Sequence, residues 1–232
     1  ITLVGSWPRS KSLLRAQKAK RRGQLSPAEF QRVADDEVLR VLALQQEAGV
    51  DIVTDGEQRR DSFFSFVAEK LKGVQMMTLA EMLDIIEDKA GFEMILQTLD
   101  VPAFSISNAT CVGPVSRRDS LAVDEVRFLK QHTDKPVKVP LPGPYLLTRG
   151  MFVREVTQPH YETKEALGDA VVEILRSEIR ELLEQGADFI QFDEPVLTEV
   201  VFTQGQARTF MCAHLAATND PTQELEFAVS LM

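Results

Sequence analysis

A regular alternation of strand-like and helix-like segments limits what this chain can fold into. Strand-like apolar segments, each followed by polar or Gly/Pro-rich residues, lie at 1–7, 50–54, 104–111, 137–141 and 187–192. Helix-like segments separate them, and strands that alternate with helices form parallel sheets. The pattern therefore predicts an α/β fold with a parallel sheet, either doubly wound or a (βα)8 barrel.

The segments between the strands have recognisable boundaries. Ser26-Pro27-Ala28-Glu29 follows a short basic helix and forms a capping box with Pro at the first helical position, which opens a long helix. Helices are expected at 26–48, 63–71, 119–132 and 163–185, and from Asp220 onward. Irregular structure is expected at 74–102, and "PGPYLLTRG" (142–150) is expected to be a loop rather than a regular element.

The polar residues that follow the strands favour the barrel. "GSWP", "DGEQRRD", "PGPY" and "DEP" each follow a strand, and the carboxyl ends of barrel strands meet on the face that carries enzyme sites. The sequence has no GxGxxG or P-loop motif after a strand. We expect one incomplete (βα)8 barrel over residues 1–232, with about five βα units present and the remaining strands beyond Met232.

Composition excludes several classes of partner. The formal net charge of −9 argues against a nucleic-acid surface, because phosphate binding needs clustered Lys and Arg. No apolar run approaches the roughly 20 residues that cross a bilayer, and no signal peptide is recognisable, so we expect no membrane partner and a cytoplasmic location. The two cysteines, Cys111 and Cys212, are far apart in sequence, and we expect both to be reduced.

The loop after the second strand carries a dense group of charges. In "DGEQRRD", Asp55, Glu57 and Asp61 are interspersed with Arg59 and Arg60. Such a group suits a zwitterion, because carboxylates bind an ammonium while a guanidinium or backbone N–H groups bind a carboxylate. The alternative is a surface loop of weak ion pairs, and this segment alone does not decide between them.

Paired acids also end the fifth strand, in "FIQFDEP". Neighbouring residues on a strand face opposite ways, so only one of Asp193 and Glu194 can face a site. We expect Asp193 to face it, and Glu194 to be structural, bonded to neighbouring backbone N–H groups. At the first strand, Gly5 allows close backbone approach and Ser6 offers a hydroxyl and N–H groups for a carboxylate, although a tight turn capped by Ser6 is the alternative.

Four motifs in this order resemble a known family. "LVGSWPRS", "DGEQRRD", "PVKVPLPGPYLL" and "FIQFDEPVLTE" are similar to segments of the catalytic barrel of cobalamin-independent methionine synthases and their shorter single-barrel relatives. The resemblance implies methionine biosynthesis without cobalamin: a zinc-bound homocysteine thiolate attacks the methyl group of a reduced folate. It also implies that Gly5 and Ser6 hold the homocysteine carboxylate, that Glu57 and Asp193 hold its ammonium, and that Glu199 faces the pterin.

The zinc ligands of that family have no counterpart in this sequence. The resemblance implies a His-x-Cys pair after the sixth strand, and the sequence contains none. Cys212-Ala213-His214 has the reverse order on an expected helix, where residues two apart do not share a face. We therefore expect no metal ligand within 1–232, with the ligands beyond Met232, and we expect the isolated piece to be inactive.

Other functions remain open at this stage. One is zinc-dependent alkyl transfer to another small thiol, as in coenzyme M transferases, although a sulfonate thiol would leave Glu57 and Asp193 without an ammonium. Another is a non-catalytic amino-acid-binding barrel, and a third is a scaffold fragment that binds no ligand. The methyl donor, a folate or another carrier, is not determined by the sequence.

Overall fold

The computed structural model describes residues 1–85, 107–203 and 220–232. The chain divides into two compact units. Unit 1 comprises residues 1–66, 120–141 and 178–191, and unit 2 comprises 67–119, 142–177 and 192–232. Each unit is therefore built from segments that lie far apart in the sequence.

Parallel pairing joins the first strand-like segments of unit 1. Thr2 pairs with Ile52, and Val53 pairs with Val137, both in the parallel direction. These contacts confirm that the N-terminal segment, the segment near Ile52 and the segment near Val137 are parallel neighbours. The regular pairing is shorter than the sequence predicts, because it is limited to single bridges.

The parallel order continues in a two-stranded sheet of β3 (Lys138–Pro142) and β4 (Phe189–Asp193). Phe189 N donates to Val137 O at 3.1 Å, and Gly143 N donates to Asp193 O at 2.9 Å. The bonded residues advance in the same direction along both segments, so the pair is parallel. The strands expected at 137–141 and 187–192 are thus confirmed to within two residues.

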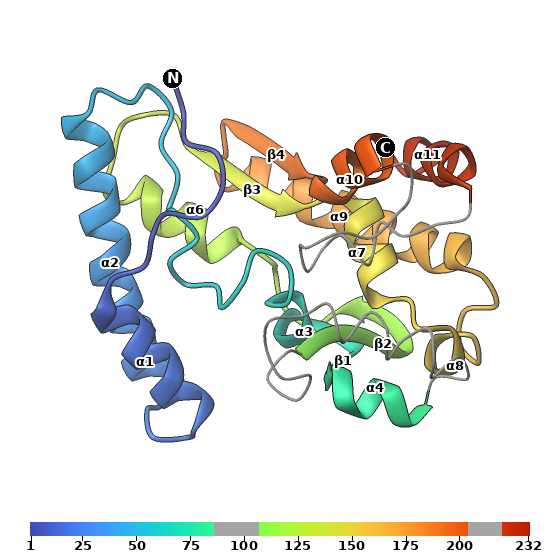
Figure 1. The fold of residues 1–232 in the computed structure, drawn as a ribbon. Helices are drawn as coiled ribbons and strands as arrows, with labels where there is room; N and C mark the ends of the chain where they lie inside the picture. Colours follow the sequence, from blue (N-terminus) through green and yellow to red (C-terminus); the bar gives the residue numbers. More distant parts are fainter. Residues whose placement is uncertain (86–106, 204–219) are drawn as a thin grey trace. The chain divides into compact units, whose positions relative to one another are not determined.

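In the described part of the chain, unit 1 contains three complete helices, of which the second and third pack on these segments (Figure 1). They are α1 (Lys11–Arg21), α2 (Pro27–Glu47) and α6 (Val123–Lys130), and α1 contacts α2. The predicted capping box is confirmed at the start of α2, where Ser26 Oγ accepts from Glu29 N and the Glu29 carboxylate accepts from Ser26 N at 2.8 Å. Helix α6 starts at Val123, four residues later than the sequence predicts.

The core of unit 1 joins α2 and α6 to the parallel segments. One buried cluster contains residues of both helices and of the strand segments: Val38, Leu42, Val50, Val53, Leu129 and Val137. A second cluster packs α1 on the first half of α2: Leu13, Ala16, Phe30 and Ala34. Burial of these side chains stabilises the unit, at about 25 cal/mol for each Å² of apolar surface removed from water.

Unit 2 contains an antiparallel hairpin that the sequence did not predict. Strands β1 (Leu71–Thr78) and β2 (Ser107–Arg117) pair antiparallel, and they are flanked by α3 (Val67–Lys70) and α4 (Leu79–Ile85) (Figure 1). The helix expected at 63–71 is therefore mostly wrong, and the irregular region expected at 74–102 begins with a strand and a helix. The rest of that region lies outside the described residues.

The count of about five βα units is also wrong, because the third expected strand belongs to this hairpin. Residues 107–111 lie in β2, which pairs antiparallel with β1, and the parallel order passes from Val53 directly to Val137. The pairing of β1 with β2 is interrupted by a bulge. Its register shifts between Lys72 and Val74, where Gly73 has a φ of +73°. The buried residues of β1, Leu71, Val74 and Met77, are three apart, which does not resemble strand alternation.

Residues 142–150, expected to be a loop, form most of a helix instead. Helix α7 (Pro144–Met151) begins with Pro144 at its first position, where proline is tolerated because that N–H has no helical partner. Gly143 occupies the N-cap position and, as a glycine, has no side chain to cap the helix. The described residues also form α8 (Arg154–Thr157), α9 (Lys164–Glu184), α10 (Pro195–Thr203) and α11 (Pro221–Ser230).

Two of these helices confirm sequence predictions. Helix α9 matches the helix expected at 163–185 to within one residue at each end. Helix α11 starts after Asp220, whose side chain accepts from Thr222 N and Gln223 N. Within the described ranges, no helix is long and apolar enough to cross a membrane.

Candidate functional site

The loop that follows the second parallel segment is buried, although it is rich in charge. Asp55, Glu57 and Arg60 are only 2%, 1% and 3% exposed, and Gln58 is fully buried. Ionised side chains are seldom buried unless they are paired or bind something. The interpretation of this loop as a surface group of weak ion pairs is therefore wrong.

Local hydrogen bonds hold the loop in an unusual backbone conformation. Gly56 has a φ of +66° and Glu57 a φ of +56°, a left-handed conformation that costs free energy for a residue with a Cβ. Glu57 N donates to Asp55 Oδ1 at 2.8 Å, and Gly56 N donates to Thr54 Oγ1 at 3.1 Å. A Cβ on Gly56 would lie 2.9 Å from Trp7 Cβ, so glycine is required at this position.

The N-terminal segment lies against this loop and brings two of the predicted site residues together. Trp7 N donates to Gly56 O at 3.0 Å, and Gln58 Nε2 donates to Trp7 O at 2.9 Å. These bonds place Ser6 so that its Oγ donates to Glu57 Oε2 at 2.9 Å. The result is a buried carboxylate beside an exposed serine, at the carboxyl ends of neighbouring parallel segments.

Gly5 supports this arrangement through its backbone. It has a φ of +75°, and a Cβ built on it would meet no atom within 4 Å. The glycine is therefore explained by its left-handed conformation, which other residues adopt at a cost. In this structure nothing approaches closely enough to require it for space.

The two arginines of the loop are engaged within unit 1. Arg59 donates to Asp35 Oδ1 through Nε at 2.8 Å and lies over the Phe128 ring, 4.1 Å from its centre. Arg60 donates to Glu125 through Nε at 3.0 Å and Nη2 at 2.5 Å. These contacts give both guanidinium groups a protein partner, so the hypothesis that they bind a ligand carboxylate loses its support.

Burial and charge act against each other in the Arg60–Glu125 pair. Burial raises the pKa of Glu125 to about 7, although the charge of Arg60 lowers it. Burial alone would lower the pKa of Arg60, but Glu125, followed by Asp55 and Glu57, raises it above its usual value. The guanidinium is therefore charged, and the carboxylates of the loop act on that charge.

At the end of β4, in unit 2, the two adjacent acids have different surroundings. The Glu194 carboxylate accepts from Tyr145 N at 2.8 Å and from Leu146 N at 2.9 Å, which confirms the predicted structural role. Burial raises its pKa to about 7, with the two N–H groups opposing that shift. Asp193 is half-buried, and its carbonyl accepts from Gly143 N.

The remaining predicted residues are only partly described. Glu199 lies in α10, but its side chain is outside the described part of the structure, as are Cys212 and His214. The assignment of Glu199 to a pterin and of Asp193 to an ammonium therefore stays a prediction. Cys111 is buried, and burial raises the pKa of its thiol, so it is a poor nucleophile or metal ligand.

The described residues do not fit a zinc ion. Among residues 1–85, 107–203 and 220–232, no group of three or more His, Cys, Asp or Glu side chains could hold a metal. Structural and catalytic zinc sites take at least three such protein ligands. The zinc of the sequence-based hypothesis therefore remains an expectation about residues that the structure does not describe.

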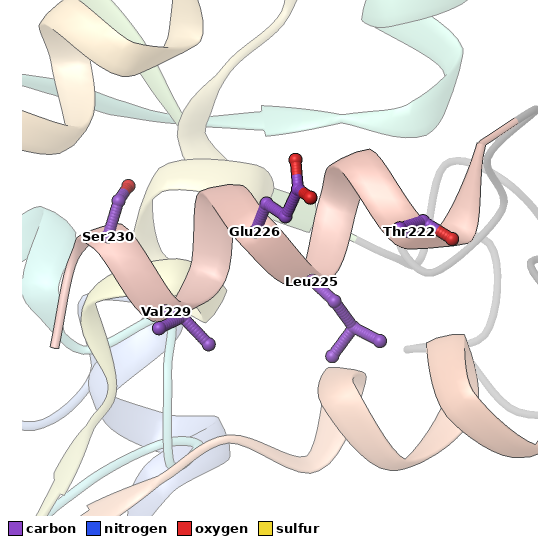
Figure 2. Close-up of a pocket in the computed structure, with 5 residues that line it drawn as sticks. All are labelled: Thr222, Leu225, Glu226, Val229 and Ser230. Carbon is purple, nitrogen blue, oxygen red and sulfur yellow. The ribbon is translucent and has the colours of Figure 1, made fainter.

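A hollow on unit 2 contains none of the predicted site residues. It has a volume of about 420 Å³ and lies along one side of α11, where Leu225 and Val229 project from the helix (Figure 2). Thr222, Glu226 and Ser230 complete its lining. The residues that line it give no reason to assign it to the chemistry of the buried loop.

Some residues that shape the loop were missed in the sequence. Gln45 is 1% exposed; its amide donates to Thr54 O at 2.8 Å and accepts from Thr54 N at 3.0 Å. Glu125 lies among the buried residues Val123 and Val126 of α6. In both helices a polar residue occupies the buried face, and that break in the apolar pattern was the available signal.

Comparison with known proteins gives consistent matches. The family model described as "Cobalamin-independent synthase, Catalytic domain" matches residues 1–219. A protein named methionine synthase from Sulfurisphaera tokodaii is 30% identical over 198 residues, which are 84% of this chain and 52% of that protein. A 5-methyltetrahydropteroyltriglutamate–homocysteine methyltransferase from Mycobacterium bovis is 31% identical over 206 residues, 86% of this chain and 24% of that protein.

A solved structure shows the same fold. The B12-independent methionine synthase of Shewanella sp. W3-18-1, in complex with selenomethionine, matches with a TM-score of 0.62 and 28% identity, covering 94% of this chain and 57% of that one. The chain thus spans about half the length of the methionine synthases that it matches, and about a quarter of the longer methyltransferase.

Proposed function

Because the chain belongs to the cobalamin-independent methionine synthase family, whose catalytic-domain model matches residues 1–219, we propose that it takes part in methyl transfer to homocysteine. In this reaction the homocysteine sulfur bonds to the methyl carbon, the bond from that carbon to the donor breaks, and the thiol proton passes to the donor. The products are methionine and the demethylated donor. The name of the mycobacterial relative supports a reduced folate as that donor.

The observation that carries the proposal is the contact of Ser6 with Glu57. Glu57 is buried and held in a left-handed conformation, and its carboxylate accepts from Ser6 Oγ at 2.9 Å. A buried carboxylate is a strong partner for an ammonium group, and a neighbouring hydroxyl and N–H groups suit a carboxylate. We assign Glu57 to the ammonium of homocysteine, and Gly5 and Ser6 to its carboxylate.

Other parts of the proposal rest on the sequence. From the family resemblance alone, we propose that Asp193 binds an ammonium and that Glu199 faces the pterin of the donor. We also propose that residues 1–232 belong to one (βα)8 barrel, which the parallel order of the described segments supports. The described residues do not fit a zinc ion, and none of the roles assigned to them involves one.

Glu57→Gln tests the assignment of the ammonium. Replacing the carboxylate by a neutral amide removes a charged hydrogen bond, which is worth about 1.5–3 kcal/mol. We therefore expect L-homocysteine affinity, measured by isothermal titration calorimetry, to fall by at least about tenfold.

Glu37→Gln is the matched control, because Glu37 also accepts a serine hydroxyl, from Ser10 at 2.5 Å, but lies outside the loop. We expect it to leave the affinity unchanged. Equal affinity of wild type and Glu57→Gln would remove Glu57 from the site and, with it, the structural support for the proposal.

A further inference from the structure

The buried loop brings a guanidinium close to the carboxylates that are proposed to bind an ammonium. Arg60 N donates to Glu57 O at 3.3 Å, both side chains are buried, and the charges of Asp55 and Glu57 act on the guanidinium and raise the pKa of Arg60. A free guanidinium at this position would be an internal substitute for the ammonium of a ligand. It would compete with the ligand for the carboxylate of Glu57.

The structure shows what prevents this competition. All three guanidinium nitrogens of Arg60 donate elsewhere: Nε and Nη2 to the two oxygens of Glu125, and Nη1 to Pro140 O at 2.8 Å. The guanidinium also lies over the Phe66 ring, 4.5 Å from its centre. A bidentate pair with a carboxylate combines two charge-assisted hydrogen bonds and fixes the orientation of the guanidinium.

The loop also carries two buried carboxylates, those of Asp55 and Glu57, that are not part of the Arg60–Glu125 pair. Asp55 Oδ2 is buried, and it accepts no hydrogen bond from the described part of the chain. Asp55 Oδ1 is engaged by Glu57 N, which fixes the left-handed residue. The carboxylates at 55 and 57 therefore act on a cation whose own hydrogen bonds are made to Glu125 and Pro140.

We propose that Glu125 is a positioning residue, which holds the Arg60 guanidinium away from Glu57 and so leaves the Glu57 carboxylate for the ammonium of an amino-acid ligand. This inference rests on the proposed function. The Arg60–Glu125 pair then has a role in ligand selection. It maintains the preference of the site for a thiol acid that carries an α-ammonium over the same thiol acid without one.

The test compares two ligands that differ only in that ammonium, L-homocysteine and 4-mercaptobutanoate. Both dissociation constants are measured by isothermal titration calorimetry, and their ratio is the readout. In Glu125→Gln the guanidinium loses its charged partner and is free to pair with Glu57. We expect the preference for homocysteine to fall by about tenfold, the usual value of one charged hydrogen bond.

If Glu125 had only a structural role, Glu125→Gln would not change this ratio, because a less ordered loop would lower the affinity for both ligands by the same factor. Glu178→Gln is the matched control: Glu178 is a fully buried carboxylate of the same unit that accepts from Leu121 N and Ala122 N, away from Arg60. We expect it to lower stability and keep the wild-type ratio. The double variant Arg60→Met/Glu125→Gln removes the competing cation, and we expect its ratio to return to within about threefold of wild type.

The outcomes separate the inference from the proposed function. A wild-type protein that does not prefer homocysteine overturns both. A wild-type preference that Glu125→Gln leaves unchanged overturns the inference alone, as does a double variant whose ratio stays as low as that of Glu125→Gln. Should Glu125→Gln not fold, Arg60→Lys replaces it: a compact ammonium cannot span both Glu125 oxygens and Pro140 O, so an unchanged ratio there overturns the inference.

Discussion

At the scale of single residues, Glu57 combines two features that cost free energy. It has a φ of +56°, and its carboxylate is almost completely buried. A left-handed residue other than glycine costs on the order of 1 kcal/mol, and a buried carboxylate costs more unless it is compensated. Residues of this kind persist where the surrounding structure holds them, and they cluster at functional sites.

Glu57→Gly separates stability from binding. Glycine adopts the left-handed conformation without strain and removes the buried charge, so we expect the free energy of unfolding to rise by about 1 kcal/mol. Homocysteine affinity should fall as in Glu57→Gln, because the carboxylate is lost. Urea unfolding monitored by circular dichroism measures the first quantity; a clear loss of stability would show that Glu57 serves the fold rather than the site.

The sequence indicated some of these residue roles and missed others. Ser6 and Glu57 were identified because their strand-end motifs stand out, and the structure brings them together. The pairing of Arg60 with Glu125 was not predicted, because the partners are 65 positions apart. From sequence alone, an arginine among acidic residues in a loop could bind either a ligand or another side chain. Only the three-dimensional contact decides between these roles.

At the scale of elements, helix α7 depends on a cap that comes from another part of the chain. Glu194, at the end of β4, accepts from Tyr145 N and Leu146 N, and a Cβ on Gly143 would lie 2.1 Å from Glu194 Oε1. A carboxylate at a helix N-terminus satisfies free N–H groups and interacts favourably with the helix dipole. The sequence of 142–150 alone could not predict this helix, because its cap is about 50 residues away.

The raised pKa of Glu194 predicts a pH dependence of stability. Its pKa is about 7 in the folded protein, above the usual value of 4.5, so the folded state holds a proton that the unfolded state has lost. The stability that this provides is complete below about pH 4.5 and is lost as the pH rises to about 7.

Glu194→Gln should remove the contribution of Glu194 to the decline between pH 5 and 7. Thermal unfolding measured across this range checks it. Glu125, with a pKa also raised to about 7, contributes a decline of the same sign that the variant keeps, so the slope should become smaller without vanishing. An identical slope in wild type and variant would contradict the assignment.

At the scale of the whole chain, the alternation of strands and helices predicted the α/β class and most of the parallel order. Segments near Thr2, Ile52, Val137 and Phe189 pair as expected because each is a short apolar run followed by polar residues. The hairpin of β1 and β2 was missed because the buried residues of β1 are three apart rather than two, and because composition does not show whether a strand pairs parallel or antiparallel. The prediction therefore failed where a strand leaves the repeating pattern.

We propose that this chain binds homocysteine as an amino acid, through the carboxylate of Glu57. The most direct measurement is a pair of calorimetric titrations of the wild-type protein, one with L-homocysteine and one with 4-mercaptobutanoate. We expect homocysteine to bind at least about tenfold more tightly than 4-mercaptobutanoate, because only homocysteine carries the ammonium. Equal affinity for the two ligands, or no binding of homocysteine, would contradict it.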